Sequence, residues 1–169
     1  MNIFVISDNI NTNASILDDK RLNKMIIETG QILCSALNIK AKSNVAPYRT
    51  THTNHPCVKW AFDSNNWLWL YQLLIEYGNE YSRRFNKEHK TITTLVSSRS
   101  LISTFVRLNL DSISEIDSNN HTPFVNCSFY KEEEVFPAYQ KTLVDKWKAD
   151  KRTPKWTNTT TPSFFEGIN

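Results

Sequence analysis

The segment DDKRLNKMIIETGQILCSALN, residues 18–38, decides the fold of this chain. Its apolar side chains recur every three or four positions, which is the spacing of an amphipathic helix. The residues of this apolar stripe are Leu22, Met25, Ile26, Ile32 and Leu33. Two aspartates at its beginning favour the positive end of a helix dipole. The sequence therefore predicts a long helix from about Asp18 to Asn38 with one buried face.

The polar face of this helix carries Lys20, Lys24 and Glu28, which are spaced four residues apart and so share one side. Two amines and a carboxylate, with the chain-terminal amine nearby, are sufficient for amine-based nucleophilic chemistry on a sugar or carbonyl carbon. The alternative is a solvated face with an ordinary Lys24–Glu28 ion pair, because such pairs are common on helices.

Two more helices are expected. Ser64 or Asn65 caps a second long amphipathic helix that runs to about Asn86, and a last helix begins near Glu132–Glu134 and ends near Ala149. We therefore predict a mainly α fold. It is a compact single domain, residues 1–169, with two long amphipathic helices, a C-terminal helix and an irregular basic and aromatic tail at 151–169.

The remaining segments give weaker signals. Their predicted structures are an edge strand or a buried tail at 2–7, a polar turn at 8–13, a polar loop at 39–56, a short helix at 56–62, a helix at 91–105 and an irregular segment at 110–126.

Composition limits the function. Only three glycines occur, which argues against a glycine-rich phosphate loop. The net charge of +3 permits nucleic-acid binding without requiring it. Three cysteines without repeated spacing argue against a disulfide framework, so we expect a reducing, cytoplasmic location. No apolar run approaches the roughly 20 residues of a membrane span, so we expect no contact with a membrane.

A short loop brings His52, His55 and Cys57 close together in sequence. Imidazole and thiolate are zinc ligands, but a structural site usually needs four, and this spacing is not a zinc signature. We therefore expect no metal and no cofactor. His55 is suited to recognition or proton transfer, and the alternative is a histidine that caps the loop against Pro56.

The C-terminal region is basic and contains two tryptophans. Its six cations are Lys141, Lys146, Lys148, Lys151, Arg152 and Lys155. Cations that bind phosphates and aromatic rings that stack on bases are typical of nucleic-acid binding. The alternative is a solvated helix face. We expect Trp147 in the core and Trp156 accessible.

Three segments in this order resemble the small helical pyrimidine-dimer DNA glycosylases that are also abasic-site lyases, the phage endonuclease V type. They are residues 17–33, residues 55–60 with the helix that ends EYSRRFN at 80–86, and residues 146–156. Together they cover about half of the chain. The opening MNIFV and the segment NHPC also resemble a group of phage-encoded proteins.

This resemblance implies that Glu28 is the catalytic carboxylate and that an amine attacks the sugar. In the best-known members the amine belongs to an N-terminal Thr; here Asn2 disfavours removal of the initiator residue, so the amine would be that of Met1, with Lys24 as the alternative. Ile27 stands where the family has Arg. Base loss then leaves an imine, and β-elimination cuts the strand.

We thus expect a DNA N-glycosylase for damaged or modified pyrimidines, with or without lyase activity, that acts as a monomer on double-stranded DNA carrying a lesion or modified base. The expected DNA-contacting residues are Asn2, Lys20, Arg21, Arg49, His52, His55, Arg84, Lys151, Lys155 and Trp156. One alternative is an N-glycosidase or base-modifying enzyme for hypermodified DNA or a nucleotide. Another is a non-enzymatic phage protein that binds DNA or a host factor.

Overall fold

The computed structural model describes residues 1–165, and within that range it contains helices and no β-strand. The helices are α1 (Ile10–Ser15), α2 (Asp19–Lys40), α3 (Pro56–Trp60), α4 (Ser64–Phe85), α5 (Lys90–Ile92), α6 (Ser100–Leu108) and α7 (Val135–Lys148). The mainly α fold with two long helices and a C-terminal helix is confirmed. Residues 166–169 of the predicted tail lie outside the described residues.

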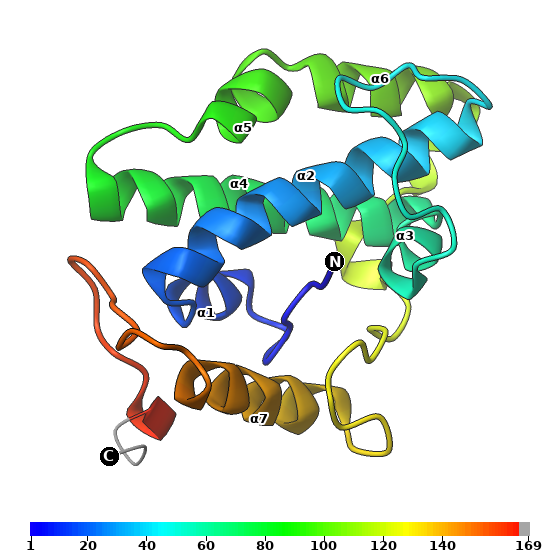
Figure 1. The fold of residues 1–169 in the computed structure, drawn as a ribbon. Helices are drawn as coiled ribbons and strands as arrows, with labels where there is room; N and C mark the ends of the chain where they lie inside the picture. The colour runs from blue at the N-terminus through cyan, green and yellow to red at the C-terminus, as the bar shows by residue number, and fades with distance from the viewer. Residues whose placement is uncertain (166–169) are drawn as a thin grey trace.

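Helices α2 and α4 cross at the centre of the molecule, and α5 and α6 cover one side of the pair (Figure 1). Trp67 of α4 donates its indole N–H to the carbonyl of Leu33 on α2, over 3.1 Å, and its ring stacks on Phe105 of α6. A Cβ atom on Gly78 would lie 2.8 Å from the Ile92 side chain, so this glycine permits the close approach of α5 to α4.

The N-terminal segment is a buried tail that passes between the α2–α4 pair and α7 (Figure 1). Ile3 and Val5 are fully buried. The Tyr77 hydroxyl of α4 donates to the carbonyl of Ile3, and the Phe4 ring contacts that of Tyr139 on α7. Of the two alternatives for this segment, the buried tail is confirmed.

The predicted polar turn at 8–13 is wrong, because these residues include the first part of α1. The Asn9 side chain caps this helix by accepting a hydrogen bond from the amide of Thr12. The Asn13 side chain accepts from the amides of Ile6 and Ser7 and so fixes the chain before the helix.

Two other boundaries differ from expectation. Helix α4 is capped by Asp63, whose carboxylate accepts from the amides of Asn65 and Asn66, rather than by Ser64 or Asn65. The predicted helix at 91–105 is interrupted: a π-helical turn at Thr93–Ser97 follows α5, and Arg99 has a φ of 56° before α6 begins.

The C-terminal tail folds back over α7. Trp147 is buried, as expected, and its indole N–H donates to Asp18 over 2.8 Å. Trp156 is buried too, and donates to the carbonyl of Ile16 over 2.9 Å. The expectation that Trp156 is accessible is therefore wrong, because its ring packs edge-on against Trp147 and contacts Phe165.

Among residues 1–165, no helix has both the length and the apolar character required to cross a bilayer.

Candidate functional site

A cavity of about 460 Å³ lies where the N-terminal tail meets α2 and α7. Its lining residues are Met1, Asn2, Phe4, Lys20, Arg21, Lys24, Met25, Glu28, Phe129, Asp145, Lys146, Ala149 and Asp150. Six residues that the sequence suggested as catalytic or DNA-contacting thus surround one cavity, namely Met1, Asn2, Lys20, Arg21, Lys24 and Glu28. Phe4 of the N-terminal tail and Met25 of α2 also line it, and the other lining residues come from the segment before α7, from α7 and from the two residues that follow it.

Glu28 faces this cavity with 15% of its side chain exposed. The Lys24 amine lies 3.5 Å from its carboxylate, and in the described part of the chain Lys24 is the only ion-pair partner of Glu28. Lys24 itself is largely exposed. The pair is therefore open to the cavity, and the carboxylate is free to interact with a bound cationic group.

Asp150 holds the beginning of α2 against the end of α7. It accepts from the Lys20 amine over 2.7 Å and from the Arg21 guanidinium over 2.8 Å. Arg21 also pairs with Asp18 and is almost fully buried, whereas Lys20 is exposed. Lys20 can therefore reach a phosphate, while Arg21 positions the wall of the cavity.

Lys146 of α7 also lines the cavity. From the sequence it was assigned only to the basic C-terminal region. Partial burial, and next the positive charges of Arg21 and Lys24, hold the pKa of Lys146 below its usual range, while Glu28 and Asp150 act in the opposite direction. A lysine with a lowered pKa carries more of the neutral, nucleophilic amine at neutral pH. Lys146 is thus a second candidate nucleophile beside the terminal amine.

Phe129 is the exposed aromatic side chain of the cavity wall, with 62% of its surface accessible. The Lys146 amine lies 4.5 Å from the centre of its ring. An exposed ring beside a cation can stack on an unpaired base while the cation binds a phosphate. Phe129 therefore offers the aromatic surface for stacking on a base that we expected from Trp156.

The positive charge of the terminal amine of Met1 acts to lower the pKa of His55, Cys57 and Cys127. The net pKa of His55 is below its usual value, mainly through burial, while Glu28 raises it. The His55 ring accepts from the amide of Cys57 over 3.2 Å and caps α3. The loop-capping alternative for His55 is therefore what the contacts show.

Cys57 and Cys127 are 3.5 Å apart, sulfur to sulfur, and the Cys57 thiol donates to Cys127. This hydrogen bond is the main cause that lowers the pKa of Cys127 and raises the pKa of Cys57. The contact joins α3 to the segment before α7.

Two other groups of predicted DNA contacts lie on exposed loops. Lys151 and Lys155 line a neighbouring hollow of about 690 Å³ that shares Lys20 with the first cavity. Arg49 and His52 are exposed on the loop between α2 and α3, and His52 has a φ of 52°.

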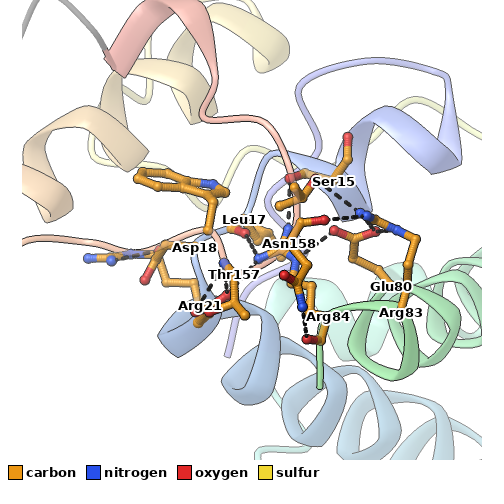
Figure 2. Close-up of polar contacts among 12 residues, drawn as sticks. Ser15, Leu17, Asp18, Arg21, Glu80, Arg83, Arg84, Thr157 and Asn158 are labelled. Atoms are coloured by element: carbon orange, nitrogen blue, oxygen red, sulfur yellow. Dashed lines mark hydrogen bonds and ion pairs between the residues drawn. The ribbon is translucent and has the colours of Figure 1, made fainter. Parts of the chain in front are cut away.

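Arg84 does not reach the surface, so its expected contact with DNA is wrong. Its side chain is 0% exposed and pairs with Glu80 over 2.6 Å and with Asp19 over 3.1 Å (Figure 2). It also donates to the carbonyls of Ser15 and Leu17. Arg84 is buried because these acceptors, which come from separate parts of the chain, surround its guanidinium.

The charge of the cavity suits an anionic ligand. Its lining includes five positive groups, namely the terminal amine, Lys20, Arg21, Lys24 and Lys146, against three carboxylates, Glu28, Asp145 and Asp150. This excess of positive charge would attract phosphates, and amines and a carboxylate lie at the same place. The arrangement can therefore combine phosphate binding with nucleophilic and proton-transfer chemistry.

Comparison with known proteins gives one match. The sequence profile of a family described as pyrimidine dimer DNA glycosylase matches residues 1–93, more than half of the chain. The matched part contains Met1, Lys24, Glu28 and His55, whereas Phe129 and Lys146 lie beyond it. No curated protein and no solved structure matches the chain.

Proposed function

Because the chain belongs to the pyrimidine dimer DNA glycosylase family, we propose that it removes a damaged or modified pyrimidine from double-stranded DNA and then cuts the abasic strand. The observation that carries this proposal is the positively charged cavity that Met1, Lys24 and Glu28 line together. We assign the nucleophile to the terminal amine of Met1 and the catalytic carboxylate to Glu28. We expect the protein to act as a monomer.

In the proposed first step, the neutral amine of Met1 attacks C1′ of the target nucleotide. The bond from C1′ to the base breaks, its electron pair goes to the base nitrogen, and the base takes up a proton. The Glu28 carboxylate stabilises the positive charge that develops on the sugar. Loss of the amine proton and opening of the sugar ring then give an imine. In this step the Glu28 carboxylate takes up the proton that the amine loses and passes it to the ring oxygen.

In the second step, removal of a proton from C2′ of the imine leads to rupture of the bond between C3′ and its oxygen. The phosphate on that side leaves as an anion, and the strand is cut. Water later hydrolyses the imine and restores the free amine. Lys24 and Lys146 are the alternative nucleophiles, since both amines line the same cavity.

The target nucleotide must leave the base stack before C1′ can be reached, which costs a few kcal/mol. We propose that the exposed Phe129 ring stacks on a base and that Lys20, Lys151 and Lys155 contact the phosphates. These contacts offset the cost of exposing the nucleotide.

Incubation of the purified chain with a duplex that carries one cyclobutane pyrimidine dimer tests the proposal. We expect cleavage of one glycosidic bond of the dimer, whose base stays attached to its neighbour through the cyclobutane ring, followed by strand cleavage, and little of either on the matched undamaged duplex. Hot alkali breaks the strand at an abasic site and so detects the first step alone. Binding should weaken steeply with salt, because each neutralised phosphate releases counterions. If neither the glycosidic bond nor the strand is cleaved at protein concentrations that saturate the duplex, the proposal is contradicted.

A second candidate function is N-glycosidase or base-modifying activity on hypermodified DNA or a nucleotide. Arg21 and Arg84 each form ion pairs with carboxylates of the protein, so these two cations are not available to bind DNA. Ile27 is exposed at the position where the family has Arg. Both observations favour this second function. Weak salt dependence together with release of a base from a nucleoside or nucleotide would identify this activity.

A further inference from the structure

A cluster of metal-ligating side chains lies outside the groups used in the proposed reaction. One ligand atom each from His55, Cys57 and Cys127 lies within 4.8 Å of the others. Cys57 is fully buried, and the other two residues are partly buried. The cluster joins the beginning of α3 to the segment before α7, which are far apart in the sequence.

The separation of the two sulfur atoms fits a shared metal ion. In a tetrahedral zinc site with zinc–sulfur bonds of about 2.3 Å, two thiolates lie roughly 3.8 Å apart. The observed distance is 3.5 Å, whereas the sulfur atoms of a disulfide are about 2.05 Å apart. Two thiolates and one imidazole are also the ligands that zinc prefers.

The chain around the ligands is held by further hydrogen bonds. The amide of Cys127 donates to the Tyr139 hydroxyl over 3.0 Å, and that hydroxyl donates to the carbonyl of Val125. The Asn2 side chain donates to the carbonyl of Cys127 over 3.3 Å. Such hydrogen bonds hold the residues that would ligate a metal ion in place before the ion binds. They also connect the cluster to the N-terminal tail.

We propose that His55, Cys57 and Cys127 bind a zinc ion or another soft divalent metal ion, with water as the fourth ligand. The thiols that ligate the ion release their protons to solvent. The bound ion would fasten the segment before α7 to α3 and, through Asn2, hold the N-terminal tail beside the cavity. The sequence favoured no metal here because the local loop lacks a complete ligand set; the fold adds Cys127 and leaves His52 out of the cluster.

This inference goes beyond the proposed function and does not depend on it. The test uses the full chain, stripped with a chelator and kept reduced with a phosphine, and titrated with Co²⁺ alone. We expect one Co²⁺ per chain, with thiolate-to-cobalt charge-transfer absorption and the visible bands of a tetrahedral ion. Zn²⁺ should displace the cobalt and raise the midpoint of thermal unfolding, because it binds the folded chain.

The main variant is Cys127→Ser, since Cys127 is only partly buried and less apt to affect folding than Cys57. We expect its metal affinity to fall by at least about 100-fold, because loss of outer-shell partners alone costs 10- to 100-fold. Cys34→Ser is the control: it removes a thiol that is not part of the cluster and should leave metal binding unchanged. Circular dichroism checks that both variants are folded.

Absence of thiolate-to-cobalt absorption, or equal metal affinity of Cys127→Ser and the wild type, would overturn the proposal. A disulfide between Cys57 and Cys127 after exposure to oxidised glutathione, together with no metal binding by the reduced chain, would also overturn it and would identify a redox pair instead. None of these measurements contains DNA. A failure of the metal site is thus separate from a failure of the glycosylase assay.

Discussion

Replacement of Glu28 by glutamine should slow glycosidic-bond cleavage at a pyrimidine dimer by about 10²- to 10⁴-fold, the range typical of a general acid or base. The amide keeps the shape of the side chain but can neither stabilise a cationic sugar nor transfer a proton. The measurement is single-turnover glycosidic-bond cleavage with protein in excess of DNA, read as strand breaks after hot alkali. Under that condition, differences in affinity do not affect the rate.

DNA binding separates this chemical effect from an electrostatic one. Glu28→Gln removes a negative charge from a positively charged cavity, so its affinity for DNA should be equal to or higher than that of the wild type. Glu76→Gln on α4 removes the same charge elsewhere, and we expect it to keep the wild-type rate. If Glu28→Gln cleaves the glycosidic bond as fast as Glu76→Gln, the catalytic role of Glu28 is wrong.

Replacement of Arg84 by methionine should lower the free energy of unfolding by about 3–5 kcal/mol, as is typical when one partner of a buried ion pair is removed. Glu80 would keep its charge in a buried position with only Arg83 to pair with it, and the carbonyls of Ser15 and Leu17 would lose a donor. Because domains are stable by roughly 5–15 kcal/mol, this loss is large. Urea denaturation followed by circular dichroism measures it.

Arg83→Met is the matched control, because Arg83 pairs with the same Glu80 but is 50% exposed. We expect a loss of only about 1 kcal/mol, since water solvates the half-exposed Arg83 and Glu80 keeps its buried partner Arg84. The double variant Glu80→Gln/Arg84→Met should recover part of the loss, because the stranded charge is gone. Equal stabilities of Arg84→Met and Arg83→Met would contradict the structural role of Arg84.

The long helices could be predicted from the sequence because their apolar residues repeat over many turns. The spacing of the apolar residues from Leu22 to Leu33 places them on one face only when the segment is helical, and that face can then be buried. Helix α1 was missed because its six residues are mostly polar and show no such repeat. It forms because the side chains of Asn9 and Asn13 bond to backbone amides, and this pattern also occurs in turns.

The part of the candidate site that could be predicted is the part within one helix. Lys20, Lys24 and Glu28 are related by helical spacing alone. Lys146 and Phe129 join them only because α7 packs beside the N-terminal tail, and no local pattern indicates that contact.

Arg84 and Trp156 were expected to be exposed and to contact DNA, but both are buried. Both belong to residue types that often contact DNA, and both lie near clusters of cations in the sequence. Their burial depends on partners distant in the chain, Asp19 for the guanidinium and the carbonyl of Ile16 for the indole. Composition and local spacing do not indicate such distant partners. The sequence alone therefore could not distinguish an exposed arginine or tryptophan from a buried one.

The central claim is that the terminal amine of Met1 forms an imine with the sugar. Its most direct test is reduction with borohydride while the protein acts on a dimer-containing duplex, followed by mass spectrometry of the cross-linked peptide. We expect a covalent adduct on the amine of Met1, a residue that lines the cavity together with Glu28. Glycosidic-bond cleavage without any trapped adduct, or an adduct on Lys24, Lys146 or any other amine than that of Met1, would contradict this assignment.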